Sequence, residues 1–168
     1  MPGRLGGIPE FYLTTTDSLL VHTTMFSIRP MTLNDHDSVI QLMKATPGIT
    51  IRKADSREAT ARYLARNPGL SQVAVIGTEL VGCIMAGHDG RRGYLQHLVV
   101  QTGHRHKGIA AALVQTCVEA LANSGIDKCH IDVLQTNPEG AAFWEHFGWT
   151  LRSDIKRYSF TQSGNANA

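Results

Sequence analysis

The alternation of apolar and polar residues along the chain predicts strands and helices in a definite order. Apolar and polar residues alternate over residues 26–30, which is typical of a short strand that ends at proline. Apolar residues then recur at helical spacing in two segments, one between residues 32 and 48 and one that Ser56 caps and residues 67–69 close. These signals predict one strand followed by two helices.

The rest of the chain repeats this alternation with longer elements. Strands are predicted over residues 73–76, 80–86, 94–100 and 129–133, and helices from residue 109 to the stop at residues 124–125 and from 138 to about 146. Asn137 reads as the cap of the last helix, and the β-prone residues 148–149 and 155–160 are expected to close the domain. Hairpins followed by strand–helix–strand–helix predict a mixed sheet with helices on its faces.

Length and local composition predict a single domain with loose ends. A chain of 168 residues with 42% hydrophobic content suits one globular domain. Residues 1–24 lack periodicity and the marks of a signal peptide, so we interpret them as a flexible or added extension. The domain is expected over residues 25–162, and residues 163–168 form a polar tail.

Net charge and cysteine content limit the kinds of binding partner and the cellular compartment that we expect. The net charge of +2 argues against wholesale binding of nucleic acid and suits an anionic small ligand. The three cysteines lie in apolar runs and read as reduced, buried residues of a cytoplasmic protein. Since no apolar run approaches the roughly 20 residues of a membrane helix, no membrane partner is expected.

The segment around Gly108 has the character of a phosphate site. It follows the apolar run Leu98-Val99-Val100 and opens a long amphipathic helix. The first amides of a helix lack partners and carry the positive end of the helix dipole, so they bind phosphate readily. Arg105 and Lys107 add positive charge beside them. The P-loop pattern and the dinucleotide fingerprint are both absent, which argues against a Rossmann-type nucleotide domain.

Two motifs carry a family resemblance. Arg105-x-x-Gly108-x-Ala110 resembles the acyl-CoA loop of the GNAT N-acetyltransferases, and residues 134–149, from Leu134 to Trp149, resemble the family's second signature. The resemblance implies an α+β fold with a central mixed, mostly antiparallel sheet, splayed strands and helices on both faces. It also implies transfer of acetyl from acetyl-CoA to a primary amine of a small molecule or a protein.

The resemblance implies how CoA binds. The strands ending at Val100 and Leu134 would splay apart, and the pantetheine arm would fill the gap like an added strand. Main-chain groups of Leu98 and Val100 would bond pantetheine, and an amide at Val99 or Val100 would polarise the thioester carbonyl. The residues expected to hold the pyrophosphate are Arg105, His106, Lys107, Gly108, Ile109, Ala110 and Ala111. Asn137 would reach pantetheine, or serve only as a helix cap, and Trp144 would pack in the core and edge the channel.

The chemistry needs a base for the amine and an acid for the thiolate. The family often has a tyrosine acid where this chain has Trp144, whose indole is not an acid. Tyr94 stands where some members carry a glutamate base, and Gln96 on the same face cannot act as a base. His88 is the best candidate base, with Asp89 behind it, and the alternative interpretation is a turn histidine without a catalytic role.

Several alternatives stay open. His97 is expected to lie on the face of its strand opposite to Tyr94 and Gln96 and to have a structural role. No metal site is expected at His104 and His106, because no cysteine or acid stands at ligand spacing. The loss of the family's tyrosine also admits a non-catalytic acyl-CoA-binding or sensor module. The acceptor is not readable, although residues 48–55 are a candidate wall of its pocket. Family members often dimerise through edge strands, so a homodimer is admitted.

Overall fold

A five-stranded sheet forms the centre of the computed structural model, which describes residues 25–168. The strands are β1 (Ser27–Pro30), β2 (Gln72–Ile76), β3 (Glu79–His88), β4 (Gly93–Val100) and β5 (Cys129–Ile131). They lie side by side in chain order, antiparallel from β1 to β4, with β5 parallel to β4. The predicted mixed, mostly antiparallel sheet is therefore confirmed. The predicted extension over residues 1–24 lies outside the described residues.

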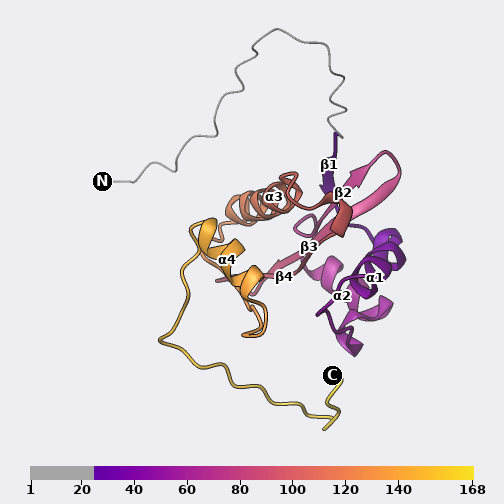
Figure 1. The fold of residues 1–168 in the computed structure, drawn as a ribbon. Helices are drawn as coiled ribbons and strands as arrows, with labels where there is room; N and C mark the ends of the chain where they lie inside the picture. Colours follow the sequence, from indigo (N-terminus) through magenta and orange to yellow (C-terminus); the bar gives the residue numbers. More distant parts are fainter. Residues whose placement is uncertain (1–24) are drawn as a thin grey trace, which may run out of the picture.

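Helices cover both faces of this sheet, as the sequence predicts (Figure 1). The short turn η1 (Leu33–Asp35) precedes α1 (His36–Lys44), and η2 (Lys53–Asp55) precedes α2 (Arg57–Arg66). The turn η3 (Thr102–His104) precedes α3 (Ile109–Asn123), and the last helix is α4 (Pro138–His146). Helices α1 and α2 lie on one face, and α3 and α4 on the other. None of the helices between residues 25 and 168 is long and apolar enough to cross a membrane.

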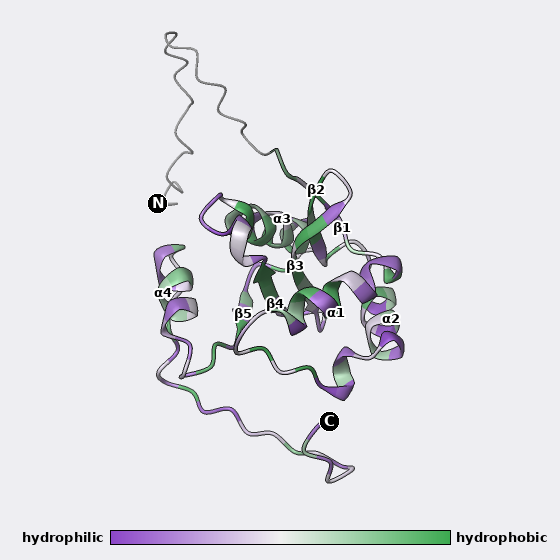
Figure 2. Ribbon diagram, turned by 45° about the vertical axis from the view of Figure 1, so that its right-hand side comes forward, coloured by the Kyte–Doolittle hydropathy of each residue, from purple (hydrophilic) through white to green (hydrophobic). Residues whose placement is uncertain are grey.

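Two apolar cores form on the two faces of the sheet. One lies under α3 and α4 and includes Leu95, Leu113 and Leu121. The other lies under α1 and α2 and includes Met43, Cys83 and Val99. The central strands are accordingly hydrophobic on both sides, which Figure 2 shows as green ribbons between the helices. Burial on both faces is what allows β3 to read as a nearly continuous apolar run.

Local signals place the helix starts where the sequence predicts them. The Ser56 hydroxyl accepts a hydrogen bond from the Ala59 amide at 3.3 Å, so Ser56 caps α2. The Asn137 side chain accepts one from the Gly140 amide at 2.9 Å, with Pro138 at the first helical position of α4. These caps satisfy amides that would otherwise lack partners.

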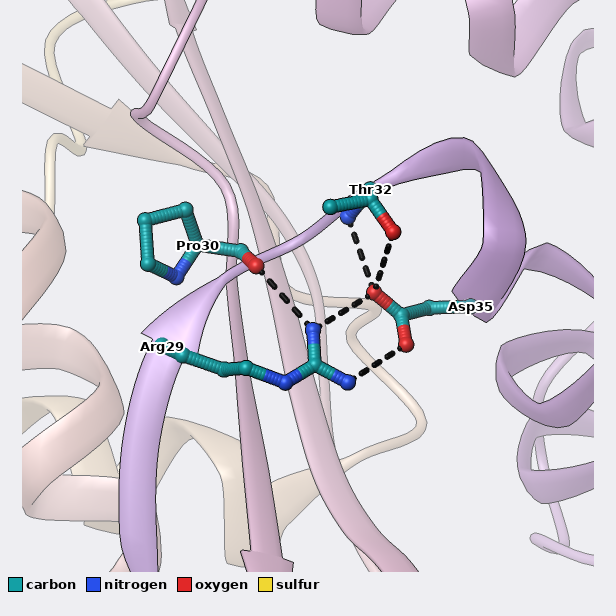
Figure 3. A network of polar contacts seen from close by, with 4 residues as sticks. All are labelled: Arg29, Pro30, Thr32 and Asp35. Carbon is teal, nitrogen blue, oxygen red and sulfur yellow. Dashed lines mark hydrogen bonds and ion pairs between the residues drawn. The ribbon is translucent and has the colours of Figure 1, made fainter.

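A charged contact joins β1 to the start of α1 (Figure 3). The Arg29 guanidinium donates two hydrogen bonds to the Asp35 carboxylate, at 2.8 and 2.7 Å. The same carboxylate accepts from the Thr32 amide at 2.8 Å and from the Thr32 hydroxyl at 3.1 Å. The guanidinium holds the pKa of Asp35 below its usual range. The Asp35 side chain therefore links β1 to the start of α1.

The C-terminal segment differs from the prediction. No strand forms over residues 155–160, and Tyr158 and Phe160 are 87% and 90% exposed. The strand β5 also ends at Ile131, before Val133. β-Prone residues form a strand only where a ladder partner is available, and the chain turns away around the Arg152–Asp154 ion pair.

The polar tail contacts η2. The Ala166 carbonyl accepts a hydrogen bond from the Arg52 guanidinium at 3.1 Å, and the Asn167 carbonyl accepts one from the Lys53 amide at 3.0 Å. The last residues therefore lie beside the loop that precedes α2.

Replacing Asp35 by Asn should destabilise the protein by about 1–2 kcal/mol at pH 7, because it weakens the ionic contact with a half-exposed Arg29. The folded pKa of Asp35 is lowered, so its contribution is complete above the unfolded value of about 4 and is lost as pH falls through the folded pKa. Urea unfolding at pH 7 and pH 3 measures this. The exposed pair offers a control, since Asp154→Asn should leave stability unchanged at both pH values. An equal loss for Asp35→Asn at both pH values would contradict this account.

Candidate active site

The site is built around a fork between β4 and β5. Strand β4 pairs with β3 to its last residue, with Val100 opposite Gly82. It pairs with β5 only from Gly93 to Leu95. Beyond that point the main chain of β4 on the β5 side has no ladder partner, and Leu134 lies outside any strand and 67% exposed. The predicted splay of these two strands is present.

A β-bulge in β4 changes which way its side chains point. Met85 pairs with Gln96 and Cys83 with Val99, so two residues of β4 stand opposite one of β3. His97 lies in the bulge with φ at +51°, a left-handed conformation rare for a residue other than glycine. The expectation that His97 points away from Gln96 is wrong, because strict alternation fails at a bulge.

The His97 side chain reaches the α1–α2 side and contacts Asp55. Its Nε2 lies 2.8 Å from the Asp55 Oδ1 atom, and the carboxylate is nearly buried, at 7% exposure. The other carboxylate oxygen accepts the Arg52 amide at 2.7 Å. Residues 48–55, the candidate wall of the acceptor pocket, are therefore attached to β4 at the point where β4 and β5 have diverged.

Residues 101–108, which we call the anion loop, connect β4 to α3. His106 and Gly108 have φ values of +59° and +79°, and the first hydrogen bond of α3 runs from the Ala112 amide to the Gly108 carbonyl at 3.0 Å. Within residues 25–168 the amides of residues 106–111 have no hydrogen-bond partner. Unpartnered amides in alternating left- and right-handed backbone form a cradle for anions.

The side chains of Arg105 and Lys107 are held in this loop by hydrogen bonds to main-chain carbonyls. Arg105 Nε donates to the Val100 carbonyl at 3.2 Å, and Lys107 Nζ donates to the Gly103 carbonyl at 3.0 Å. The Arg105 amide bonds the Thr102 carbonyl, so the guanidinium is the part of Arg105 left to meet a ligand. The predicted pyrophosphate residues thus come together at one helix end.

The second predicted motif lies on α4, on the α3 side of the sheet. The carbonyl oxygen of the Asn137 side chain is used as the helix cap, which leaves its NH₂ group to donate elsewhere. The Trp144 ring is 7% exposed and packs against Trp149, with ring centroids 4.7 Å apart. Trp144 is therefore mainly a core residue.

A cavity of about 180 Å³ lies on the α2 side, near the paired end of the fork. It is lined by Tyr63, Asn67, Gly87, His88, Asp89, Tyr94 and Gln96. Gly87 lets α2 approach β3, since a Cβ atom there would lie 2.7 Å from the Asn67 side chain. Asn67 holds that approach by accepting the His88 amide at 3.0 Å.

The sequence does not single out Tyr63 as part of this cavity. Its hydroxyl is buried and has no hydrogen-bond partner in the described part of the chain. Burial raises the pKa of Tyr63 to about 12, so the phenol stays neutral and can donate. The sequence predicts only that Tyr63 lies on the inward face of α2. The pattern does not distinguish a packed tyrosine from one that faces a cavity.

The two predicted bases near this cavity are already engaged. The Gly90 amide donates to His88 Nδ1 at 3.0 Å, so the free nitrogen of a neutral His88 carries the proton and has no lone pair to offer. Asp89 accepts the amides of Arg92 and Arg91 at 2.7 and 2.8 Å, and these bonds lower its pKa. Main-chain amides therefore already use a lone pair of each group.

A second, smaller hollow marks the point where β4 and β5 part. Tyr94, Gln96 and His130 line it together with Asp132, which directly follows β5 and pairs with Arg157. Asp132 places a carboxylate at the fork that sequence reasoning missed. Its only signal is an acid at the end of a strand.

The histidines of the anion loop do not assemble a metal site. Across residues 25–168, no group of three histidine, cysteine or acidic side chains comes close enough to hold an ion. The expectation that no metal takes part stays a prediction.

The comparison with protein families decides the assignment. The model of the acetyltransferase (GNAT) family matches residues 37–149. The chain belongs to the GNAT acetyltransferase family. The fork, the anion loop and α4 of this GNAT protein all lie within the matched residues.

Named relatives agree with this assignment. An acetyltransferase of Pectobacterium atrosepticum is 36% identical over 84 residues, which cover 50% of this chain and 60% of that protein. The N-alpha-acetyltransferase 30 of Xenopus laevis is 31% identical over 59% of this chain and 38% of its own length. This GNAT chain thus spans less than two thirds of either relative.

A solved structure shares the fold. The PaiA N-acetyltransferase of Thermoplasma acidophilum, in complex with coenzyme A, matches with a TM-score of 0.69 at 19% identity. The match covers 78% of this chain and 93% of that one.

The anion loop can be tested through Gly108, whose φ of +79° is unfavourable for any other residue. Gly108→Ala should weaken coenzyme A binding about tenfold, measured by isothermal titration, because left-handed backbone costs alanine about 1 kcal/mol or more and the amide cradle relaxes. Gly69→Ala is the matched control, since Gly69 has a similar φ of +75° in the turn that follows α2. It should lose stability but keep its affinity. Equal affinities for the two variants would contradict the assignment of the loop.

Proposed function

We propose that this protein transfers the acetyl group of acetyl-CoA to a primary amine. The observation that carries the proposal is the fork in a GNAT chain, where unpaired main chain of β4 leads straight to the unpartnered amides of residues 106–111. An amide-rich thioester carrier suits such a groove, because it supplies the partners that the diverging strands lack. Its phosphates suit the helix end.

Each part of the groove has an assigned role. Main-chain groups of Leu98 and Val100 bind the carrier arm, and since the Val100 carbonyl already accepts Arg105, its amide is the group available. An amide at Val99 or Val100 polarises the thioester carbonyl. Residues 105–111 hold the diphosphate, Asn137 donates its NH₂ group to the arm, and Trp144 supports α4 beside it.

The acceptor binds in the cavity between α2 and β4. Tyr63 donates from its neutral hydroxyl, and His88 donates from Nε2. Tyr94 and Gln96 line both this cavity and the hollow at the fork, so they orient the amine toward the thioester. The carboxylate of Asp89 attracts a cationic amine. The name of the Xenopus relative puts peptide α-amines among the amines to test.

We also place the protein in the cytoplasm. All three cysteines are free thiols, and Cys83 and Cys117 are buried. Buried reduced cysteines suit a reducing compartment. Dimerisation through an edge strand remains part of the proposal, since β5 has no neighbour on its outer side within the described sheet.

Acetyl transfer is tested by release of free CoA thiol from acetyl-CoA. The amines are a peptide with a free N-terminus, the same peptide N-terminally blocked but carrying lysine, spermidine, free amino acids and an aminoglycoside. We expect turnover of at least one amine and a mass gain of one acetyl group on it. Tight acetyl-CoA binding without turnover of any amine would contradict transfer and support the acyl-CoA sensor instead.

A further inference from the structure

His97 occupies a position that the sequence assigns to structure alone. The fork opens after Leu95, and the anion loop begins after Val100, five residues further. At about 3.3 Å per residue, this stretch of β4 runs about 16 Å. A carrier whose phosphates lie at Gly108 therefore brings its acyl end back toward the bulge that contains His97. The bulge turns the His97 side chain to the α1–α2 side, which also holds the acceptor cavity.

The ring of His97 lies against the carboxylate of Asp55. Its Nε2 faces the buried Asp55 carboxylate at 2.8 Å, and no hydrogen bond to Nδ1 exists among residues 25–168. A carboxylate at one ring nitrogen keeps the proton there and leaves the lone pair on the other nitrogen. At 26% exposure, the side chain remains accessible. This is the reverse of His88, where Nδ1 is already used.

We propose that His97 is the proton acceptor of the reaction and that Asp55 orients it. The inference rests on the proposed acetyl transfer and names the base for that site. Nδ1 takes a proton from the acceptor's ammonium, and the freed lone pair forms the C–N bond with the acetyl carbonyl carbon. The C–S bond breaks with its electron pair on sulfur. The thiolate takes the second amine proton, and His97 returns its proton to water.

The other titratable groups near His97 are either neutral or already hydrogen-bonded. Those packed on the same side are Asp55 of η2, His36 of α1, Tyr63 of α2 and Cys83 of β3. Burial raises the pKa values of Cys83 and Tyr63 to about 12, so both remain neutral. His36 is bonded through Nε2 to the Asp55 carbonyl at 2.9 Å and through Nδ1 to Asp37 at 3.2 Å, so neither of its nitrogens is free.

Kinetics of His97→Gln and Asp55→Asn test this role, with the amine that the wild type acetylates best. We expect kcat/KM of His97→Gln to fall by about 100- to 1,000-fold and to lose the acidic limb of its pH profile, while the KM for acetyl-CoA changes little. Asp55→Asn should fall by about tenfold or more, because the amide donates to Nε2 and moves the ring proton to Nδ1. His146→Gln, at an exposed histidine of α4, is the matched control and should behave as wild type.

Other outcomes separate this inference from the proposed function. The His97→Gln variant could instead stay active, keep the acidic limb of the pH profile, and show a lowered melting temperature or a raised KM for the acceptor. That result would mean that the His97–Asp55 contact only holds the loop that contains Asp55. Imidazole ¹⁵N spectra of the wild type give a test without any variant, and we expect a protonated Nε2 and a bare Nδ1. A protonated Nδ1 in an enzyme that acetylates amines would overturn the base alone. No turnover by the wild type would overturn the transfer reaction together with its base.

Discussion

The early end of the β4–β5 ladder is the constraint on which the site depends. Three residue pairs join these strands before they diverge, so a stretch of β4 is left with main-chain groups that need partners. The cost of burying such groups unpaired explains why the groove suits a ligand with amides of its own. Everything else in the site is arranged along that stretch: the bulge near its start, the anion loop at its end, and the acceptor cavity beside it.

Much of the fold and of the anion loop could be predicted from the sequence. Capping residues such as Ser56 and Asn137 act within a few residues of chain, so their signals are local and the structure confirms them. The order strand, turn and helix around Gly108 is equally local. The prediction failed where a contact between distant segments decides the outcome. Residues 155–160 have the composition of a strand, but no neighbouring strand is there to pair with them.

The candidate catalytic residues were the least predictable part. His88 is the base candidate that the sequence favours, yet the amide of Gly90 donates to its Nδ1 atom. His97 was set aside on the rule that alternate residues of a strand face opposite sides, which a bulge suspends. Asp55 lies forty-two residues earlier, in a loop without periodicity. Which histidine meets a carboxylate is a property of tertiary structure, and no local pattern encodes it.

The extra residue in β4 also couples the two halves of that strand. Before the bulge, Leu95 faces the core under α3; after it, Val99 faces the core under α1 and Val100 again faces α3. If the same residues ran on without the bulge, strict alternation would turn Val99 toward α3 and Val100 toward α1, and would rotate the start of the anion loop with them. The bulge therefore sets the phase between the first half of β4 and the loop that follows it, so alignments of such chains should leave a gap at this position rather than carry the strand across it unbroken.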